Sequence, residues 1–164
     1  MKEYIITSTE ETEDVSVTVK RKDEDGHAVL YDMPHIIYHS PTGLEYGYGG
    51  SGPADLALSI LADFFEEEPP RRTHSKFYDF NPRWIECQVC EGRGSTRASA
   101  TSTTETCSDC DGEGGRSKSW YCWINHQDFK WDFIAKMDRN EGFVIKDTDI
   151  KQWLSTRVSE KTVS

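Results

Sequence analysis

Four of the five cysteines form two C-x-x-C pairs separated by sixteen residues, Cys87/Cys90 and Cys107/Cys110. Each pair opens the same pattern, C-x-x-C-x-G-x-G, over residues 87–94 and 107–114. Four thiolates at this spacing are typical of a tetrahedral zinc site. The glycines allow the chain to turn back so that backbone N–H groups point at the sulfur atoms. We therefore predict that these four cysteines bind one structural Zn²⁺ ion.

Other uses of the cysteines are less favoured. Disulfides do not fit the cytoplasmic setting that the rest of the sequence indicates, and a redox C-x-x-C pair needs a βαβ context that is missing. An iron-sulfur cluster takes the same number of thiolates and stays open as an alternative. Four protein ligands leave no position for a catalytic water. The fifth cysteine, Cys122, lies four residues before His126, but we predict an ordinary buried thiol rather than a second metal ligand.

Composition limits the class of protein. The chain has 164 residues with 35% hydrophobic and 12% aromatic residues, which suits one domain with a core and excludes full disorder. No apolar stretch approaches the length of a membrane helix, and the N-terminus lacks the pattern of a signal peptide.

The negative charge is concentrated in the first part of the chain. Residues 1–68 carry four Lys/Arg against fifteen Asp/Glu, so the net charge of -10 arises there. Bulk phosphate neutralisation is excluded as a binding mode, and a protein partner is favoured over nucleic acid.

Hydrophobic patterns predict the elements that surround the cysteines. Alternating valines at 15–19, a turn at 23–26 and the segment 27–31 indicate a hairpin, and residues 4–6, 36–38 and 142–145 are further predicted strands. A helix capped by Ser51 or Gly52 should centre the core, and its acidic end at 66–68 is interpreted as a solvated charge cluster. Two later helices are predicted, one with a single apolar face at Phe129, Phe133, Ile134 and Met137, and one capped by Asp147 or Thr148.

These elements predict an α+β fold, with a small antiparallel sheet packed on two or three helices and an inserted zinc-knuckle hairpin. Residues 1–84 and 121–157 should form the single domain, 85–120 the insertion and 158–164 a flexible tail. The basic and aromatic residues of the insertion and its base are candidate partner contacts: Arg93, Arg97, Arg116, Lys118, Trp120 and Trp123.

A glycine-rich loop precedes the first predicted helix. Gly47, Gly49 and Gly52 satisfy G-x-G-x-x-G, but Pro53-Ala54 stands where a phosphate-binding loop has Lys and Ser/Thr. The N-terminus of a helix can still hold an anion, which makes a nucleotide or phosphate site at Gly49, Gly50, Ser51 and Gly52 the second hypothesis. A structural turn is the favoured interpretation, since Glu45 and Asp55 flank the loop with negative charge.

Two resemblances follow from these motifs. The C-x-x-C-x-G-x-G knuckles resemble half of the cysteine-rich region of DnaJ-type co-chaperones, without the His-Pro-Asp motif of the J domain. The run from Thr42 to Leu61, TGLEYGYGGSGPADLALSIL, and the segment 125–135 resemble a small domain family of unknown function found in bacteria, phages and prophages. The first resemblance implies a protruding zinc hairpin, and the second implies a phage-linked α+β domain without known catalytic residues.

We therefore expect a non-enzymatic, zinc-stabilised interaction protein of phage or mobile-element type, located in the host cytoplasm. Host takeover or anti-defence activity is compatible with this expectation. The third hypothesis is a small enzyme centred on His126, with Lys130 and either Glu45 or Asp55 beside it. The remaining histidines, His27, His35, His39 and His74, show no ligand spacing along the sequence.

Overall fold

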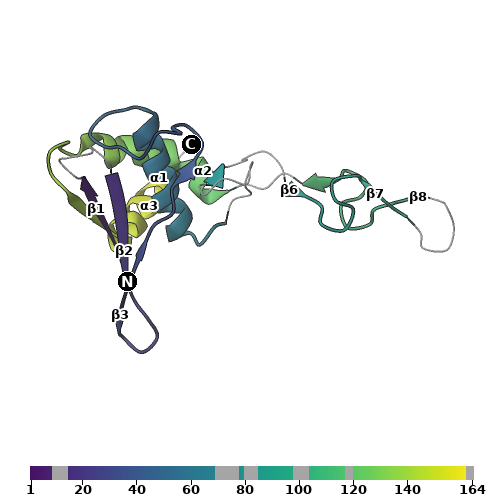
Figure 1. Cartoon of the computed structure of the whole chain (residues 1–164), viewed down its shortest axis with the longest axis horizontal. Coiled ribbons are helices and arrows are strands. Elements are labelled where there is room, and N and C mark those ends of the chain that lie inside the picture. Colours follow the sequence, from purple (N-terminus) through teal and green to yellow (C-terminus); the bar gives the residue numbers. More distant parts are fainter. Residues whose placement is uncertain (9–14, 69–77, 80–84, 98–103, 117–119, 162–164) are drawn as a thin grey trace.

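The computed structural model describes residues 1–8, 15–68, 78–79, 85–97, 104–116 and 120–161. Its body holds a four-stranded antiparallel sheet in the order β10-β1-β2-β3 (Figure 1). These strands span Phe143–Lys146, Lys2–Ser8, Val15–Lys22 and Ala28–Asp32 respectively. The predicted hairpin is confirmed as β2 and β3, and the strand predicted at 4–6 is confirmed as part of β1. The strand predicted at 142–145 corresponds to β10, which begins one residue later.

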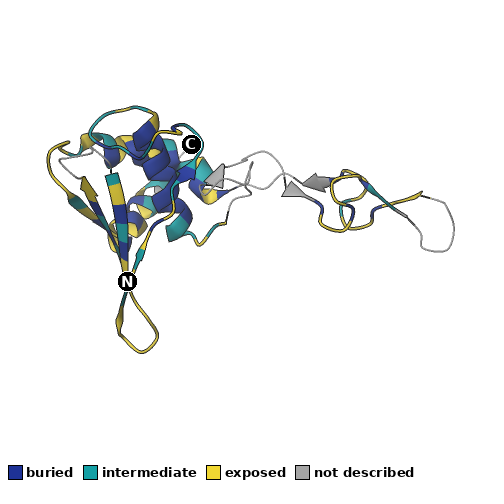
Figure 2. Cartoon of the chain, in the orientation of Figure 1, coloured by how far each residue is buried: buried dark blue, intermediate teal, exposed yellow. Residues whose placement is uncertain are grey.

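One face of the sheet belongs to the core. Tyr4 and Ile6 of β1 and Val17 and Val19 of β2 are buried, while their neighbours along each strand are more exposed. Tyr4 lies opposite both Val19 and Ile145, so three strands place large apolar side chains on the same face. Figure 2 shows that buried residues also line the helices of the body, above all α1.

Helix α1 (Ser51–Phe64) is the centre of the core, as predicted, because every residue from Gly52 to Ala62 is buried. Its N-cap is Gly50 rather than Ser51 or Gly52, and no side chain caps it. A helix that is buried on every side lies inside a domain, and α1 packs against both α2 and the short strand β4 (Ile36–Ile37).

Helix α2 (Tyr121–Asp132) ends earlier than predicted, because the predicted apolar face continues to Met137. The chain tightens at Phe133 into a 3-10 turn, η1 (Ile134–Lys136), and Met137 is extended. Phe129 and Ile134 are nevertheless fully buried. Helix α3 (Asp147–Lys161) includes Asp147, one of its two predicted caps, as its first residue, and it continues into the segment predicted as a tail.

The remaining strands are short. Strand β4 (Ile36–Ile37) pairs in parallel with β5 (Tyr78–Asp79), while residues 44–46 form no strand. Strand β6 (Ile85–Glu86) pairs with β9 (Gly115–Arg116), and β7 (Ser95–Arg97) pairs with β8 (Thr104–Thr106). We call residues 85–97 and 104–116 the cysteine arm. In Figure 1 the arm stands clear of the body.

The α+β fold with a small antiparallel sheet, three α-helices and four clustered cysteines matches the predicted fold class. Among the described residues, no helix is both long and apolar enough to cross a membrane.

Candidate metal centre

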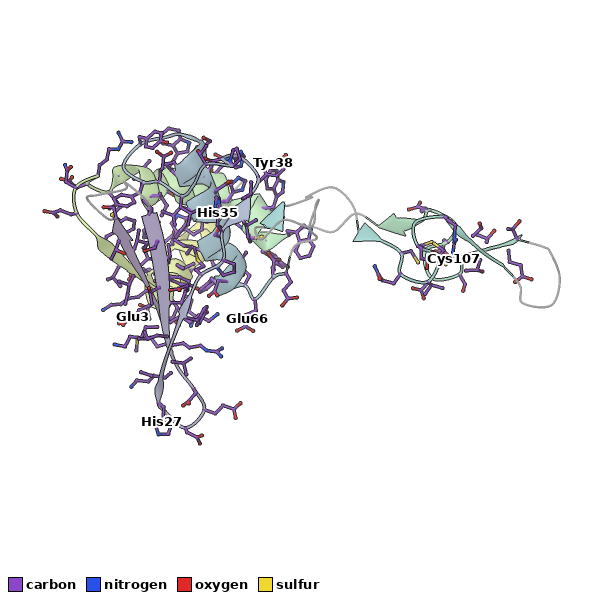
Figure 3. The ribbon with its side chains drawn as sticks, in the orientation of Figure 1. Glu3, His27, His35, Tyr38, Glu66 and Cys107 are labelled. Carbon is purple, nitrogen blue, oxygen red and sulfur yellow. The ribbon has the colours of Figure 1, made fainter. Side chains whose placement is uncertain are left out.

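The four cysteines of the arm meet at one point. Their sulfur atoms all lie within 4.8 Å of one another (Figure 3). The Cys87–Cys107 and Cys90–Cys110 sulfur pairs are 3.8 and 3.7 Å apart, and all four cysteines carry free thiols. A disulfide holds its sulfurs at about 2.05 Å, so these distances belong to separate thiols facing a shared centre. The arrangement is suited to a single metal ion.

The two knuckles have nearly the same backbone. Cys87 N–H donates to the carbonyl of Gly114 at 2.8 Å, and Cys107 N–H donates to that of Gly94 at 3.0 Å. Each knuckle also turns through a left-handed acidic residue, Glu91 or Asp111, with φ of 51° in both cases. The repeated sequence thus folds as two related halves, and each half donates a backbone hydrogen bond to the other.

Backbone N–H groups support the sulfurs, as the glycine spacing predicts. Gly94 N–H donates to Cys90 Sγ at 3.2 Å, and Gly114 N–H donates to Cys110 Sγ at 3.3 Å. Burial raises the pKa of these thiols, while the N–H groups of Gly94 and Gly114 lower the pKa of the sulfurs that they contact. A metal ion must displace the remaining protons when it binds.

Substitution of Gly94 by alanine should weaken metal binding. Gly94 has φ of +71°, and an added Cβ would lie 2.2 Å from the carbonyl oxygen of Gly112 in the other knuckle. Left-handed strain alone costs about 1–2 kcal/mol, so we expect the zinc affinity to fall at least about tenfold. Competition with a chromophoric chelator measures this. Glu91→Gly, which removes a left-handed side chain from the same knuckle, should instead leave the affinity equal or higher.

The predicted partner contacts are distributed unevenly. Arg93 is exposed on the arm, where its guanidinium pairs with Glu91 and its Nε donates to the carbonyl of Cys90. Arg97 and Arg116 lie in β7 and β9, and Lys118 lies outside the described residues. Trp120 is only 4% exposed and belongs to the core of the body, which does not fit a role as a surface contact. Trp123 is half-buried, and its ring stacks beside those of His39 and His126.

The glycine loop serves close packing. Gly47 donates its N–H to the carbonyl of Ile134 at 3.0 Å, and the ring of Trp131 lies where a Cβ on Gly49 would be. At Gly52 the same position is taken by Glu45, whose carboxylate accepts a hydrogen bond from Tyr48. Glycines at these positions therefore let the start of α1 approach its neighbours, and Glu45 adds negative charge where an anion would bind.

A second polar cluster lies in the body, around His126 of α2. Its Nε2 is 3.0 Å from Nε2 of His39, which follows β4, and 2.9 Å from the side-chain nitrogen of Gln127. His126 is 2% exposed, and its Nδ1 lies 2.6 Å from the carbonyl oxygen of Trp123. We call His39, His126 and Gln127 the histidine cluster. Sequence spacing gave no sign that His39 would join it.

Acidification should destabilise the body through His126. Burial lowers the pKa of His126 to about 4, although the Trp123 carbonyl opposes the shift. The unfolded chain takes up this proton near pH 6.5 and the native state only near pH 4, so the free energy of unfolding should fall between these values by about 3 kcal/mol. Urea unfolding across this range measures the fall. His126→Gln cannot titrate and should show a flatter profile, while equal slopes for both proteins would contradict the assignment.

Several polar residues that organise the body were missed or misread. The acidic run at 66–68 predicts a solvated cluster, but the Glu67 carboxylate instead accepts hydrogen bonds from the N–H groups of Tyr121 and Cys122, each at 2.8 Å, and so caps α2. Asp63 accepts hydrogen bonds from Lys2, Tyr4 and Tyr31, which ties α1 to the sheet. An acidic residue at the end of a helix was the available signal in both cases, but its partners lie far away in the sequence.

Asp55 is fully buried on α1. It receives the backbone N–H groups of Tyr38, His39 and Ser40, with the shortest distances at 2.9 Å. His35 Nε2 lies 3.3 Å from the same carboxylate. Asp55 therefore holds the segment that carries His39, and its carboxylate acts electrostatically on His126, beside which one of the sequence hypotheses placed it. His27, in contrast, is exposed beside Asp23 and Asp25 at the turn of the β2–β3 hairpin (Figure 3).

Comparison with known sequences covers only the first part of the chain. No curated protein and no solved structure matches it. Residues 8–80, which include the glycine loop, α1 and the segment held by Asp55, match a family of unknown function, DUF6166. The match ends before the first cysteine, so the arm lies outside it. Residues 8–80 are thus similar to a domain family whose function is unknown.

Proposed function

We propose that this protein is a non-enzymatic, zinc-binding interaction protein, of phage or mobile-element type, in which the cysteine arm contacts a partner protein. The observation that carries the proposal is the closed set of four thiols on an arm that stands clear of the body. The phage or mobile-element origin rests on the resemblance of the run from Thr42 to Leu61.

The sulfur geometry fits a zinc ion. Zn–S bonds of about 2.3 Å in a regular tetrahedron place the sulfurs about 3.8 Å apart. The Cys87–Cys107 and Cys90–Cys110 distances of 3.8 and 3.7 Å agree with this value. With four thiolates in place the ion has no open position, so its role is to hold the arm together.

The charge of the arm supports a protein partner. Its two segments contain six Asp/Glu and three Arg, and four thiolates around Zn²⁺ add a further charge of about -2. Such an arm repels a phosphate backbone. The knuckle of the first pair presents Val89, which is 57% exposed, next to the ion pair of Arg93 and Glu91. An exposed apolar side chain with charged neighbours suits a protein contact.

Capture from a lysate of the natural host tests this function. The full-length zinc protein should retain a discrete protein that survives nuclease treatment. Val89→Glu, which keeps all four ligands, should lose that protein while retaining one zinc per chain. Leu30→Glu changes an exposed residue of the body, 63% exposed on β3, and serves as the matched control. A partner that is lost on nuclease treatment, or that binds both variants equally, would contradict an arm-directed protein contact.

A further inference from the structure

With both rings uncharged, the histidine cluster has more nitrogen atoms facing one point than hydrogen bonds can satisfy. His126 Nδ1 faces the Trp123 carbonyl, an acceptor, so Nδ1 carries the hydrogen and Nε2 offers a lone pair. Suppose that His39 Nε2 donates a hydrogen bond to this lone pair. The Gln127 amide nitrogen, 2.9 Å from His126 Nε2, then competes for the same lone pair, and it also faces the His39 donor at 3.4 Å. If His39 Nε2 carries no hydrogen, two lone pairs face each other at 3.0 Å.

A cation resolves this conflict, because it accepts both lone pairs. A half-turn of the Gln127 amide then puts its oxygen, in place of the nitrogen, on the same point. We propose that His39 Nε2, His126 Nε2 and Gln127 Oε1 form a second metal site, for a divalent ion that prefers imidazole, such as Ni²⁺, Cu²⁺ or Zn²⁺. This site is separate from the cysteine arm and goes beyond the proposed function.

Distances in the cluster suit one small ion. Ligands at about 2.0–2.1 Å around a tetrahedral centre lie about 3.3–3.4 Å apart. The three observed separations are 3.0, 2.9 and 3.4 Å, so movements of a few tenths of an ångström would complete the site. Three protein ligands leave at least one position for water or a small exogenous ligand, which distinguishes this site from the closed centre of the arm.

The surroundings hold the ligands in place. The His126 ring stacks on Trp123 with centroids 4.7 Å apart, and the backbone of His39 is fixed by Asp55. The Trp123 carbonyl fixes the hydrogen of His126 on the far side of the ring, as partners of metal-binding histidines do. The Asp55 carboxylate favours a cation here and the Lys130 ammonium opposes it, so the two nearby charges counteract each other.

Titration of Ni²⁺ into untagged full-length protein, already loaded with one equivalent of Zn²⁺, tests the site by calorimetry. We expect one further equivalent to bind. His39→Ala and His126→Asn should each weaken this binding at least thirtyfold or abolish it. Gln127→Glu, which supplies a carboxylate in place of the amide, should tighten it about tenfold. His27→Ala, in the exposed group with Asp23 and Asp25, is the matched control and should change nothing.

Zinc content and circular dichroism, measured on every variant, show that the arm and the body remain folded. Because the zinc of the arm is counted separately, failure of the second site is distinguishable from failure of the proposed function. The proposal is overturned if the zinc-loaded protein binds no Ni²⁺. It is also overturned if the Ni²⁺ equivalent survives His39→Ala or disappears with His27→Ala.

Discussion

Cys107→Ser is expected to abolish zinc binding and to unfold the cysteine arm while the body stays folded. The buried cluster of the arm consists of cysteines, with Cys110 partly buried against Cys87, Cys90 and Cys107, so the described part of the arm has no apolar core of its own. In zinc-finger peptides, binding of structural zinc contributes an apparent free energy of about 10–16 kcal/mol to folding. Without the ion, the short pairs β6–β9 and β7–β8 cannot offset the loss of chain entropy.

Elemental analysis should show a fall from one zinc per chain to none, and limited proteolysis should show rapid cleavage within 85–116. Cys122→Ser provides the matched control, since Cys122 is a fully buried thiol of the body. Burial and the nearby Glu67 raise the pKa of Cys122, which keeps the thiol protonated and disfavours metal binding there. This variant should retain zinc. An arm that resists protease in Cys107→Ser would contradict a metal-dependent fold.

The arm could be predicted from the sequence because its information is local. Each knuckle is eight residues long, and the glycines that accept positive φ, such as Gly94 and Gly114, stand at fixed offsets from the cysteines. The hairpin of β2 and β3 was predictable for the same reason, since its alternation and its turn lie within one short segment. Local geometry determines these elements, so spacing is sufficient to find them.

The histidine cluster could not be predicted in this way. His39 and His126 are 87 residues apart, and no local pattern announces their contact. The early end of α2 at Asp132 likewise depends on packing, because Phe129 and Ile134 reach the core through a tighter turn that a regular helical period does not anticipate. The role of Asp55 also depends on packing, because it is the fifth residue of α1, beyond the first turn, and a segment 15–17 residues earlier in the chain supplies its donors.

Asp55→Ala is expected to cause the largest loss of stability in the body. The substitution leaves the N–H groups of Tyr38, His39 and Ser40 without their acceptor. Asp55 is 0% exposed, so water cannot replace its carboxylate. An unpaired buried donor costs about 1–3 kcal/mol, and removal of a buried charged acceptor costs about 3–5 kcal/mol in all. Because small domains have about 5–15 kcal/mol of stability, urea unfolding should show a midpoint lowered by about a third or more, or no folded state.

Asp149→Ala is the matched control, because Asp149 also accepts a backbone N–H, that of Lys146 at 3.0 Å, but does so at the surface. We expect this variant to lose about 1 kcal/mol. Asp55→Asn keeps one acceptor oxygen and places an amide donor against the remaining N–H groups, so its loss should approach that of alanine. Equal midpoints for Asp55→Ala and Asp149→Ala would show that Asp55 does not hold the 38–40 segment. The same carboxylate fixes the backbone of His39, so a folded Asp55→Asn protein should also lose affinity for Ni²⁺ at the histidine cluster.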